Sequence, residues 1–284
     1  MKQTKTLMLQ GTASGVGKST LSIGICRLLH RKGFRVAPFK AQNLSDNAHI
    51  LPDGRKMARS QAIAAAASGV SPDPDMNPAL LSPGRDGCEV IVNGRPVPRF
   101  ERDACREAAH RAYERLCGRF DAVVAEGAGS AAELNLRGGD IVNMDFALYA
   151  QCPVILVSDI RRGGVFAALY GTLALLRPEE RALVRGIIVN DFCGDPASFA
   201  EGRRILETVC EVPVLGIIPH FNLHLEDEDS LPGAATVTRE KLASFVPEGM
   251  SFEEFQEQQW DALADELEAN LDVPALLRIM EAGA

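Results

Sequence analysis

Residues 6–20 read TLMLQGTASGVGKST, and no other part of the chain says as much about its fold. Residues 6–10 predict a short buried strand, and residues 21–30 have the apolar spacing of a helix. A strand, a glycine-rich loop and a helix in this order are typical of a phosphate-binding loop (P-loop). Backbone N–H groups of such a loop point at phosphate oxygens, and the helix N-terminus adds partial positive charge.

The loop gives expected roles to its residues. Lys18 would reach the β- and γ-phosphates of a nucleotide, and the Ser19 hydroxyl would hold Mg²⁺. The usual pattern G-x-x-x-x-G-K-[ST] places Thr12 where the first glycine belongs, with Gly11 one residue earlier. A glycine-rich turn that only caps a helix is the alternative, and the strand–loop–helix context disfavours it. The nucleotide contacts expected from the loop are Thr12, Ser14, Gly15, Val16, Gly17, Lys18, Ser19 and Thr20.

The composition narrows the class of protein. The chain of 284 residues has a net charge of −8 and no basic run, which argues against a nucleic-acid or anionic-membrane partner. No segment approaches the roughly 20 apolar residues of a membrane span, and the first residues lack an apolar signal core. The seven cysteines are scattered and never form C-x-x-C, as in a reduced cytosolic protein. We therefore expect a cytoplasmic location.

Strands and helices alternate along the chain, which predicts an α/β fold of the P-loop type, with a parallel sheet flanked by helices. Apolar runs such as residues 121–126 lack alternation, as expected for strands buried on both faces. Pro38 is expected near the end of its strand. Further strands are predicted at 35–40, 89–94, 121–126, 153–159, 186–190 and 214–218, and helices at 56–68, 101–118, 164–176 and 196–210.

Ligands of parallel sheets bind beyond the carboxyl ends of the strands, so the residues that follow each strand are candidates for function. Lys40 closes one strand and could neutralise a γ-phosphate or a substrate carboxylate, although a lone lysine is more often a surface charge. Glu126 closes another strand and precedes small residues, a pattern by which P-loop enzymes hold Mg²⁺. A solvated carboxylate is the alternative at Glu126.

Two further strand ends carry polar residues. Arg161 and Arg162 precede a glycine pair and a helix, which is either a second anion site or a solvated loop. Asn190 ends the strand at 186–190, where its amide either binds a purine edge or starts a turn. The sequence leaves both pairs of alternatives open.

The composition shifts near the acidic run at 226–229, which divides the chain into a P-loop domain at 1–231 and a C-terminal segment at 232–284. That segment is expected to hold a linker and then an acidic, amphipathic helix at 251–280. The helix packs on the core in the favoured interpretation and docks a partner subunit in the alternative. His220 and His224 flank a proline loop and the acidic run, so a metal pair there is disfavoured.

Seven segments, in this order, resemble cobyric acid synthase. They span about residues 6–231, and several motifs together are far more specific than a P-loop alone. The synthetase domain of that family is similar to dethiobiotin synthetase, which also carries Gly-Thr ahead of the loop and so accounts for the displaced Gly11. The segments are GTASGVGKS at 11–19, FKAQN at 39–43, DMNP at 75–78, EGAGS at 126–130, DIVNM at 140–144, RGGVF at 162–166 and EDSL at 228–231.

The resemblance implies a ligase of cobalamin biosynthesis that amidates side-chain carboxylates of a corrinoid, adenosylcobyrinic acid a,c-diamide. ATP phosphorylates a carboxylate, and ammonia released from glutamine then displaces the phosphate. Lys18 and Lys40 act as catalytic residues that contact phosphate or carboxylate. Ser19 and Glu126 hold Mg²⁺, and Asn190 contacts adenine. The implied substrate contacts are Gln42, Asn43, Gly127, Ala128, Gly129, Ser130, Arg162, Gly163 and Gly164.

Members of that family usually continue into a glutamine amidotransferase domain with a nucleophilic cysteine, and nothing after residue 231 resembles it. We expect ammonia to come from outside or from a separate glutaminase subunit, and a homodimer remains open. Two other classes stay as alternatives: a carboxylate-activating enzyme like dethiobiotin synthetase or a,c-diamide synthase, and a non-enzymatic P-loop nucleotide switch. Switches of that branch carry a lysine early in the loop, where this chain has Ala13 or Ser14.

Overall fold

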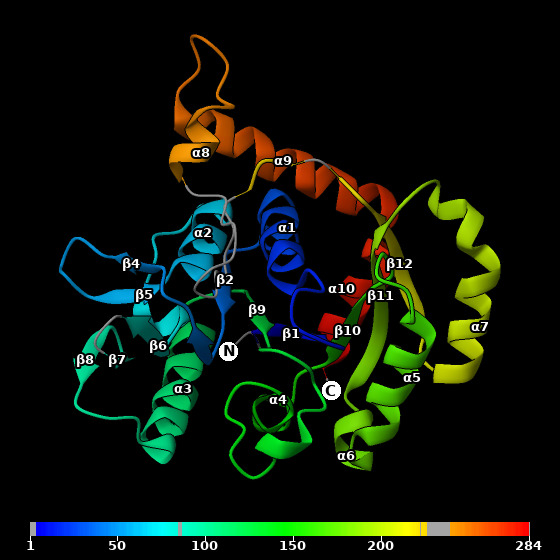
Figure 1. Cartoon of the computed structure of the whole chain (residues 1–284), viewed down its shortest axis with the longest axis horizontal. Helices are drawn as coiled ribbons and strands as arrows, with labels where there is room; N and C mark the ends of the chain where they lie inside the picture. Colours follow the sequence, from blue (N-terminus) through cyan, green and yellow to red (C-terminus); the bar gives the residue numbers. More distant parts are fainter. Residues whose placement is uncertain (1–3, 85–86, 222, 226–238, 284) are drawn as a thin grey trace.

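The computed structural model describes residues 4–84, 87–221, 223–225 and 239–283. Its centre is a sheet of six strands, namely β1 (Lys5–Gly11), β2 (Val36–Phe39), β9 (Ala122–Glu126), β10 (Val154–Asp159), β11 (Val184–Phe192) and β12 (Val214–Pro219). Their order is β12-β11-β10-β1-β9-β2, and every neighbouring pair is parallel (Figure 1). The predicted α/β fold with a parallel sheet is therefore confirmed.

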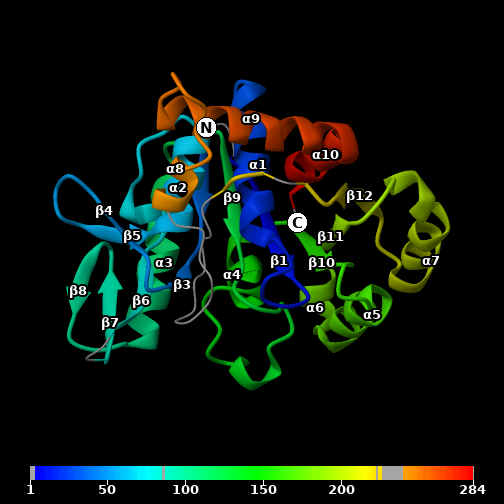
Figure 2. The same ribbon diagram turned by 45° about the horizontal axis from the view of Figure 1, so that its top comes forward.

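Helices cover both faces of this sheet (Figures 1 and 2). They are α1 (Lys18–Arg31), α2 (Arg59–Ala67), α3 (Arg102–Cys117), α4 (Met144–Ala150), α5 (Val165–Leu175), α6 (Pro178–Arg181), α7 (Ala200–Cys210), α8 (Arg239–Ala243), α9 (Phe252–Asn270) and α10 (Val273–Ala282). Apolar side chains of α1, α9 and α10 form the core on one face of the sheet. Those of α3, α4, α5 and α7 form the core on the other.

Successive residues of the central strands point to opposite faces, and both faces are covered. In β1, Leu7 and Leu9 join the core under α1, while Met8 joins the core under α3. This two-sided burial explains why the strands read as apolar runs without alternation. Pro38 lies one residue before the end of the edge strand β2, as predicted.

The chain between β2 and α3 forms a second, smaller sheet. Its strands are β3 (Gln42–Leu44), β6 (Ala79–Gly84), β7 (Gly87–Val92) and β8 (Arg95–Val97), in the order β3-β6-β7-β8. The predicted strand at 89–94 corresponds to β7, and Asn93 and Gly94 turn with φ angles of 50° and 79°. The predicted helix at 56–68 is wrong for its first three residues, because β5 (Lys56–Ala58) pairs with β4 (Ala48–Ile50) before α2 begins.

The C-terminal part forms two long helices where the sequence predicted one. The break falls at Leu271 and Asp272, between α9 and α10. There the Asp272 N–H donates to Leu215 O on β12, and the Asp272 carboxylate accepts from the Ala275 N–H as the cap of α10. The backbone is therefore bonded to the sheet at the point where a continuous helix would have needed the same N–H group.

Helix α9 packs along α1, in agreement with the favoured interpretation. Trp260, Leu263 and Leu267 are buried there, and a Cβ at Gly24 of α1 would lie 2.5 Å from Leu267 Cδ1. The acidic side chains of α9 pair with basic ones of α1, namely Glu257 and Asp261 with Arg27, Asp265 with Arg31, and Glu268 with Lys32. The predicted boundary at residue 231 lies outside the described residues. No helix that the structure describes is long and apolar enough to cross a membrane.

Candidate active site

The P-loop connects β1 to α1 as predicted, and its shape explains where its glycines stand. Gly15 and Gly17 adopt left-handed φ angles of 70° and 92°. A Cβ at Gly11 would lie 2.8 Å from both Ala13 O and Lys18 Nζ. Real Cβ atoms are essentially never found this close to other heavy atoms, so only glycine fits at position 11. The displaced glycine is therefore required mainly by the backbone oxygen of Ala13, because that atom cannot move aside as the end of the Lys18 side chain can.

Lys18 is folded back over the loop. Its Nζ donates to Ala13 O at 3.0 Å and to Gly129 O at 2.8 Å, and the side chain is buried. Thr12 is also held at the loop, because its Oγ1 lies 2.9 Å from Ser158 Oγ of β10. The ammonium thus lies between the P-loop and the loop that follows β9, where phosphates cradled by the P-loop would meet it.

Two of the predicted residues, Ser19 and Lys40, converge on one carboxylate oxygen of a third, Glu126. Ser19 Oγ donates to Glu126 Oε1 at 2.5 Å, and Lys40 Nζ lies 3.0 Å from the same oxygen. The side chains of Lys40 and Glu126 are 2% and 3% exposed, so this ion pair is almost out of water. Buried charges of this kind depend on their partners, because either one alone would be costly. Segments that are far apart in the sequence therefore form one charged cluster beneath the P-loop.

Lys40 is held by the segment around Asn77, which the sequence had marked only as part of a motif. The Lys40 N–H donates to Met76 O at 2.9 Å, and Asn77 Nδ2 donates to Lys40 O at 3.0 Å. Asn77 Oδ1 accepts from the Ala58 N–H at 2.9 Å, and Asn77 is buried. Both backbone groups of Lys40 are thus fixed, which aims its side chain at Glu126.

The predicted substrate loop, residues 127–130, lies directly against the P-loop. The Gly127 N–H donates to Leu9 O at 2.9 Å, and the Ala131 N–H donates to Gly11 O at 2.8 Å. Ala128 is tied at the next position, where its N–H donates to Asn143 Oδ1 at 2.9 Å. The Ser130 N–H donates to Glu133 Oε1 at 3.1 Å. The structure therefore brings this loop and Lys18 together.

Gln42 and Asn43 follow Lys40 in the short strand β3. Asn43 is buried, and its Nδ2 lies 3.4 Å from Ser60 Oγ at the start of α2. Its Oδ1 accepts from the Leu44 N–H at 2.9 Å. Gln42 is half-buried at the beginning of the strand. The Asn43 amide nitrogen thus lies toward α2 rather than toward Lys18, and its predicted contact with a substrate stays a prediction.

The segment between β10 and α5 also reaches the P-loop. Arg161 pairs with Asp191 at 3.4 Å, and Arg162 Nε lies 3.6 Å from Asp159 Oδ2. Arg162 Nη2 lies 4.0 Å from the place that a Cβ at Gly15 would take. Gly163 and Gly164 both have left-handed φ angles, 79° and 77°, immediately before α5. The geometry thus places Arg162 beside the P-loop, and each of the two arginines pairs with an aspartate.

Asn190, near the end of β11, holds the P-loop by a hydrogen bond. Its Nδ2 donates to Val16 O at 3.0 Å, and a Cβ at Gly17 would lie 2.1 Å from this nitrogen. The absence of a side chain at Gly17 therefore leaves the room that the Asn190 amide occupies. Its predicted contact with adenine is not visible in these bonds and stays a prediction.

A cavity of about 190 Å³ opens beside the P-loop between the ends of β10, β11 and β12. His220 lies at its wall, where Nδ1 is 2.5 Å from Asp191 Oδ1, while His224 stacks on Phe245 with ring centroids 4.0 Å apart. The two histidines therefore have separate environments and do not form a metal pair. The cavity is lined by Gly15, Val16, Gly17, Thr20, Asp159, Asn190, Asp191, Pro219, His220 and Phe221.

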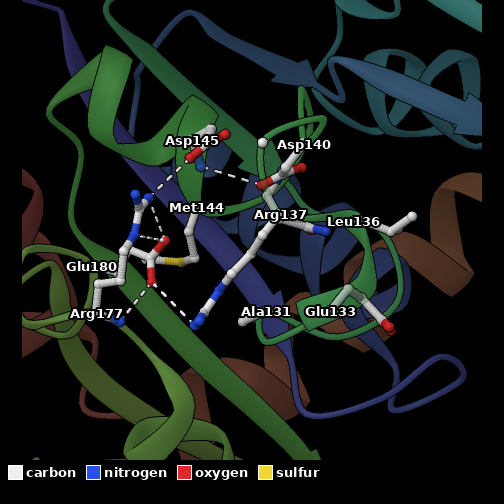
Figure 3. Close-up of a pocket in the computed structure, with 11 residues that line it drawn as sticks. Ala131, Glu133, Leu136, Arg137, Asp140, Met144, Asp145, Arg177 and Glu180 are labelled. Atoms are coloured by element: carbon white, nitrogen blue, oxygen red, sulfur yellow. Dashed lines mark hydrogen bonds and ion pairs between the residues drawn. The ribbon is translucent and has the colours of Figure 1, made fainter.

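A second cavity, of about 110 Å³, lies on the other side of the loop that follows β9 (Figure 3). Arg177 crosses it and pairs with Asp145 at 3.1 Å and with Glu180 at 2.7 Å. Arg137 Nη2 lies 4.0 Å from Glu180. The pair of Arg137 and Glu180 joins the loop to α6, and the pair of Arg177 and Asp145 joins α4 to the start of α6. Within the described part of the chain, no group of three or more His, Cys, Asp or Glu side chains could hold a metal ion.

Several residues that hold the loops of the site by hydrogen bonds were not predicted from the sequence. Asn77, Asn143 and Asp140 all lie in motifs named above. Asn77 and Asn143 bond backbone groups of other segments, and Asp140 bonds the backbone of its own turn. Gln10 was read as an ordinary strand residue, yet its fully buried amide lies against Gly127. A polar residue inside an otherwise apolar strand was the one signal that could have drawn attention to Gln10.

Residues 7–228 match the family described as the CobQ/CobB/MinD/ParA nucleotide binding domain, and the chain belongs to this family. Over 236 residues the chain is 50% identical to the cobyric acid synthase of Klebsiella pneumoniae, a match that covers 80% of this chain and 46% of that protein. It is 49% identical to the cobyric acid synthase of Salmonella typhimurium, with 80% and 47% covered. The chain therefore spans about half the length of the curated relatives it matches.

Solved structures resemble the chain more distantly. The signal recognition particle receptor FtsY from Elizabethkingia anophelis gives a TM-score of 0.47 at 16% identity, covering 92% of this chain and 66% of that one. The MinD cell division protein of Aquifex aeolicus gives 0.45 at 14% identity, covering 93% and 97%. These likenesses are too weak to add to the argument.

Proposed function

We propose that the chain binds ATP with Mg²⁺ and activates side-chain carboxylates of a corrinoid for amidation, as in the conversion of adenosylcobyrinic acid a,c-diamide to cobyric acid. The observation that carries the proposal is the buried pair of Lys40 and Glu126 beside Ser19. A P-loop that only hydrolyses nucleotide has no need of a second buried lysine at the end of β2. An enzyme that brings a carboxylate to the γ-phosphate has such a need, because two anions must meet.

In this proposal, Lys18 and Lys40 neutralise negative charge on different sides of the reacting groups. Lys18 contacts the β- and γ-phosphates together with the backbone N–H groups of the P-loop. Lys40 neutralises the incoming carboxylate or the transferring phosphoryl group from the other side. Both side chains are buried, and charges act more strongly on a ligand where water is scarce.

The residues present fit a Mg²⁺ ion at the β- and γ-phosphates. Ser19 Oγ and Glu126 Oε1 lie 2.5 Å apart, so a hydroxyl and a carboxylate oxygen are already adjacent. Mg²⁺ prefers oxygen ligands and is usually held by one or two protein groups together with phosphates and water. Bound there, the ion would neutralise charge that develops on the phosphates.

The proposed reaction has two steps. A carboxylate oxygen of the substrate attacks the γ-phosphorus, the bond to the β-phosphate oxygen breaks, and ADP leaves. Ammonia then attacks the carbonyl carbon of the acyl phosphate, loses a proton and expels inorganic phosphate to leave the amide. Residues 127–130, together with Gln42, Asn43, Arg162, Gly163 and Gly164, are proposed to contact the substrate, and Asn190 to contact adenine.

Several wider features belong to the same proposal. Ammonia is supplied as free ammonium or by a separate glutaminase, and the protein acts in the cytoplasm on a small-molecule substrate. Residues 1–231 are the synthetase domain, and residues 232–284 are a linker with an acidic helical segment. A homodimer is compatible with these assignments.

The proposal is tested by release of phosphate from ATP and Mg²⁺ in the presence of adenosylcobyrinic acid a,c-diamide, with ammonium and with glutamine in separate reactions. Corrinoid products are followed by mass. We expect stepwise conversion of carboxylates to amides with ammonium, and none with glutamine alone. Phosphate release that is independent of the corrinoid, with no change in its mass, would point to another acceptor or to a nucleotide switch and would overturn the proposal.

A further inference from the structure

Asn143 holds the loop that follows β9 from a buried position at the start of α4. Its Oδ1 accepts a hydrogen bond from the Ala128 N–H at 2.9 Å, and the residue is 4% exposed. A buried amide oxygen is costly to leave without its hydrogen-bond partner. The bond therefore fixes the backbone of Ala128.

Asp140 in turn fixes Asn143. Its carboxylate accepts from the N–H groups of Asn143 at 2.8 Å, Val142 at 3.0 Å and Asp145 at 3.2 Å. Asp145 is also paired with Arg177 across the charged cavity that Figure 3 shows. The start of α4 is thus held by hydrogen bonds within its own turn. It is also held by the ion pair between Asp145 and Arg177 at the start of α6.

The contact between Asn143 and the loop leaves no free space. A Cβ at Gly127 would lie 2.5 Å from Asn143 Oδ1 and 2.2 Å from Gln10 Oε1. The glycine therefore lets the loop lie directly on two buried amide side chains. A loop seated this closely has few alternative conformations that keep its hydrogen bonds.

The same loop reaches the P-loop lysine two residues later. Gly129 O accepts a hydrogen bond from Lys18 Nζ at 2.8 Å. Asp140 is thus linked to Lys18 in steps. Its carboxylate bonds the Asn143 N–H, and Asn143 Oδ1 bonds the Ala128 N–H. The carbonyl of the next residue, Gly129, bonds Lys18.

We propose that Asn143 is a positioning residue, which sets the conformation of residues 127–130 and through the Gly129 carbonyl fixes the ammonium of Lys18 for phosphoryl transfer. The inference rests on the proposed function, since it gives Asn143 a part in the same reaction. Asn143 touches neither phosphate nor substrate in this role. It acts through the loop, so its effect falls on the rate of the chemical step more than on the binding of nucleotide.

The experiment compares wild type with Asn143→Leu, which removes the acceptor, and with Asn143→Asp, which keeps an oxygen at the same place. Asp195→Ala is the control, because it also removes one side-chain acceptor of a backbone N–H, that of Ala197, at the start of a short 3-10 helix outside the proposed site. Hydrogen exchange of the backbone amides at 127–131 is measured first. Steady-state turnover of ATP with the corrinoid and ammonium follows.

We expect exchange at 127–131 to be about fivefold faster in Asn143→Leu and close to wild type in Asn143→Asp, as the loss of one buried hydrogen bond predicts. The kcat of Asn143→Leu should fall about tenfold or more, while the KM for ATP changes less than about threefold. Rescue by Asn143→Asp is judged on exchange, since its charge also alters the field at the phosphates. Asp195→Ala should leave both readouts unchanged.

Unchanged exchange in Asn143→Leu, or a loss of ATP binding equal to the loss of kcat, would overturn the inference. If Asn143→Leu does not fold, Gly127→Ala presses on the same contact from the loop side and should accelerate exchange over the same residues. Wild-type protein without corrinoid turnover would refute the proposed function, whereas the exchange measurement would still decide the role of Asn143.

Discussion

Oxygen Oε1 of Glu126 organises the charged residues of the site. It accepts a hydrogen bond from Ser19 and forms the ion pair with Lys40. Both members of the pair are buried, so each has exchanged its hydration for the other. The stability of the protein and its proposed chemistry are therefore linked at this cluster.

Removing one charge of the pair tests this link. Lys40→Met should lower the free energy of unfolding by about 3 kcal/mol, because Glu126 is left as a buried carboxylate without its ammonium. Urea denaturation measures the change. The double variant Lys40→Met/Glu126→Gln carries neither charge and should regain most of the lost stability. Equal stability of wild type and Lys40→Met would show that the pair is not coupled as described.

Lys18→Ala tests the assignment of the P-loop. Turnover of ATP should fall about a hundredfold or more, since a preorganised cation at the phosphates is lost. The fold should remain intact, as judged by circular dichroism and thermal unfolding. Lys32→Ala, directly after the same helix and paired with Glu268 on the surface, is the matched control and should keep full turnover. Normal turnover in Lys18→Ala would remove the P-loop assignment.

Among single residues, the sequence indicated the charged Lys40 and Glu126 as site candidates but not the amides of Asn77 and Asn143. Lys40 and Glu126 were each named as candidates because they close strands of a parallel sheet, and the ion pair between them is a finding of the structure. Asn77 and Asn143 were not predicted as supports, because their partners are backbone groups of segments distant in the sequence. No local pattern encodes a bond of that kind.

Among the elements, α9 stands out because it covers the helix that begins at the P-loop. Its apolar residues are buried against α1, and its acidic residues pair with Arg27, Arg31 and Lys32. Most of these ion pairs are at least partly exposed, so apolar packing contributes more to the attachment than charge does. The helix therefore stabilises α1 from the side opposite to the sheet.

The close approach of α1 and α9 depends on Gly24. A valine there would place its branched Cβ within about 3 Å of Leu263 and Leu267, so Gly24→Val should lower the free energy of unfolding by about 1–3 kcal/mol. Trp260, the one tryptophan of the chain, is buried on α9 and reports the change. We expect its fluorescence emission to shift to longer wavelength. An unshifted emission with unchanged stability would contradict the packing described.

The ion pairs of α9 predict a response to acid. The Arg27 guanidinium, hydrogen-bonded to Asp261, holds the pKa of that carboxyl below its ordinary value of 3.8. A carboxyl whose pKa is lower in the folded state stabilises the fold above its ordinary pKa, and this stabilisation disappears as pH falls through the folded value. Wild type should therefore lose part of its unfolding free energy below pH 3.8.

Arg27→Met is the variant that isolates this contribution. It should be about 1 kcal/mol less stable near neutral pH and should lose less stability on acidification than wild type does. Urea denaturation at neutral pH and below pH 3.8 provides the comparison. Arg106→Met, which breaks an exposed pair with Asp103 on α3, should leave the acid response as it is. Parallel acid responses in wild type and Arg27→Met would exclude the pair as its source.

The elements of the main sheet were predictable because apolar runs, glycine loops and amphipathic helices are local signals. Two elements depended on tertiary contacts. Residues 56–58 read as the start of an alanine-rich helix, but they pair with β4. The break between α9 and α10 arises from the bond of the Asp272 N–H to Leu215 O, which the helical pattern at 251–280 does not contain.

In the whole molecule, the parallel sheet places the ends of β1, β2, β9, β10 and β11 at one edge. The predicted site residues lie at or shortly after the ends of these strands, or at the start of α1. The P-loop lies at the centre of this edge. Lys40, directly after β2, lies on one side of it, and the cavity of about 190 Å³ beside β11 lies on the other.

Transfer of heavy oxygen from a carboxylate to phosphate tests the central proposal most directly. The corrinoid is prepared with both oxygens of its free carboxylates replaced by heavy oxygen, and phosphate released with ATP, Mg²⁺ and ammonium is analysed by mass. Attack of the carboxylate on the γ-phosphorus requires each released phosphate to carry one heavy oxygen. Amide formation with unlabelled phosphate, or phosphate release without amide formation, would contradict activation of the carboxylate at this site.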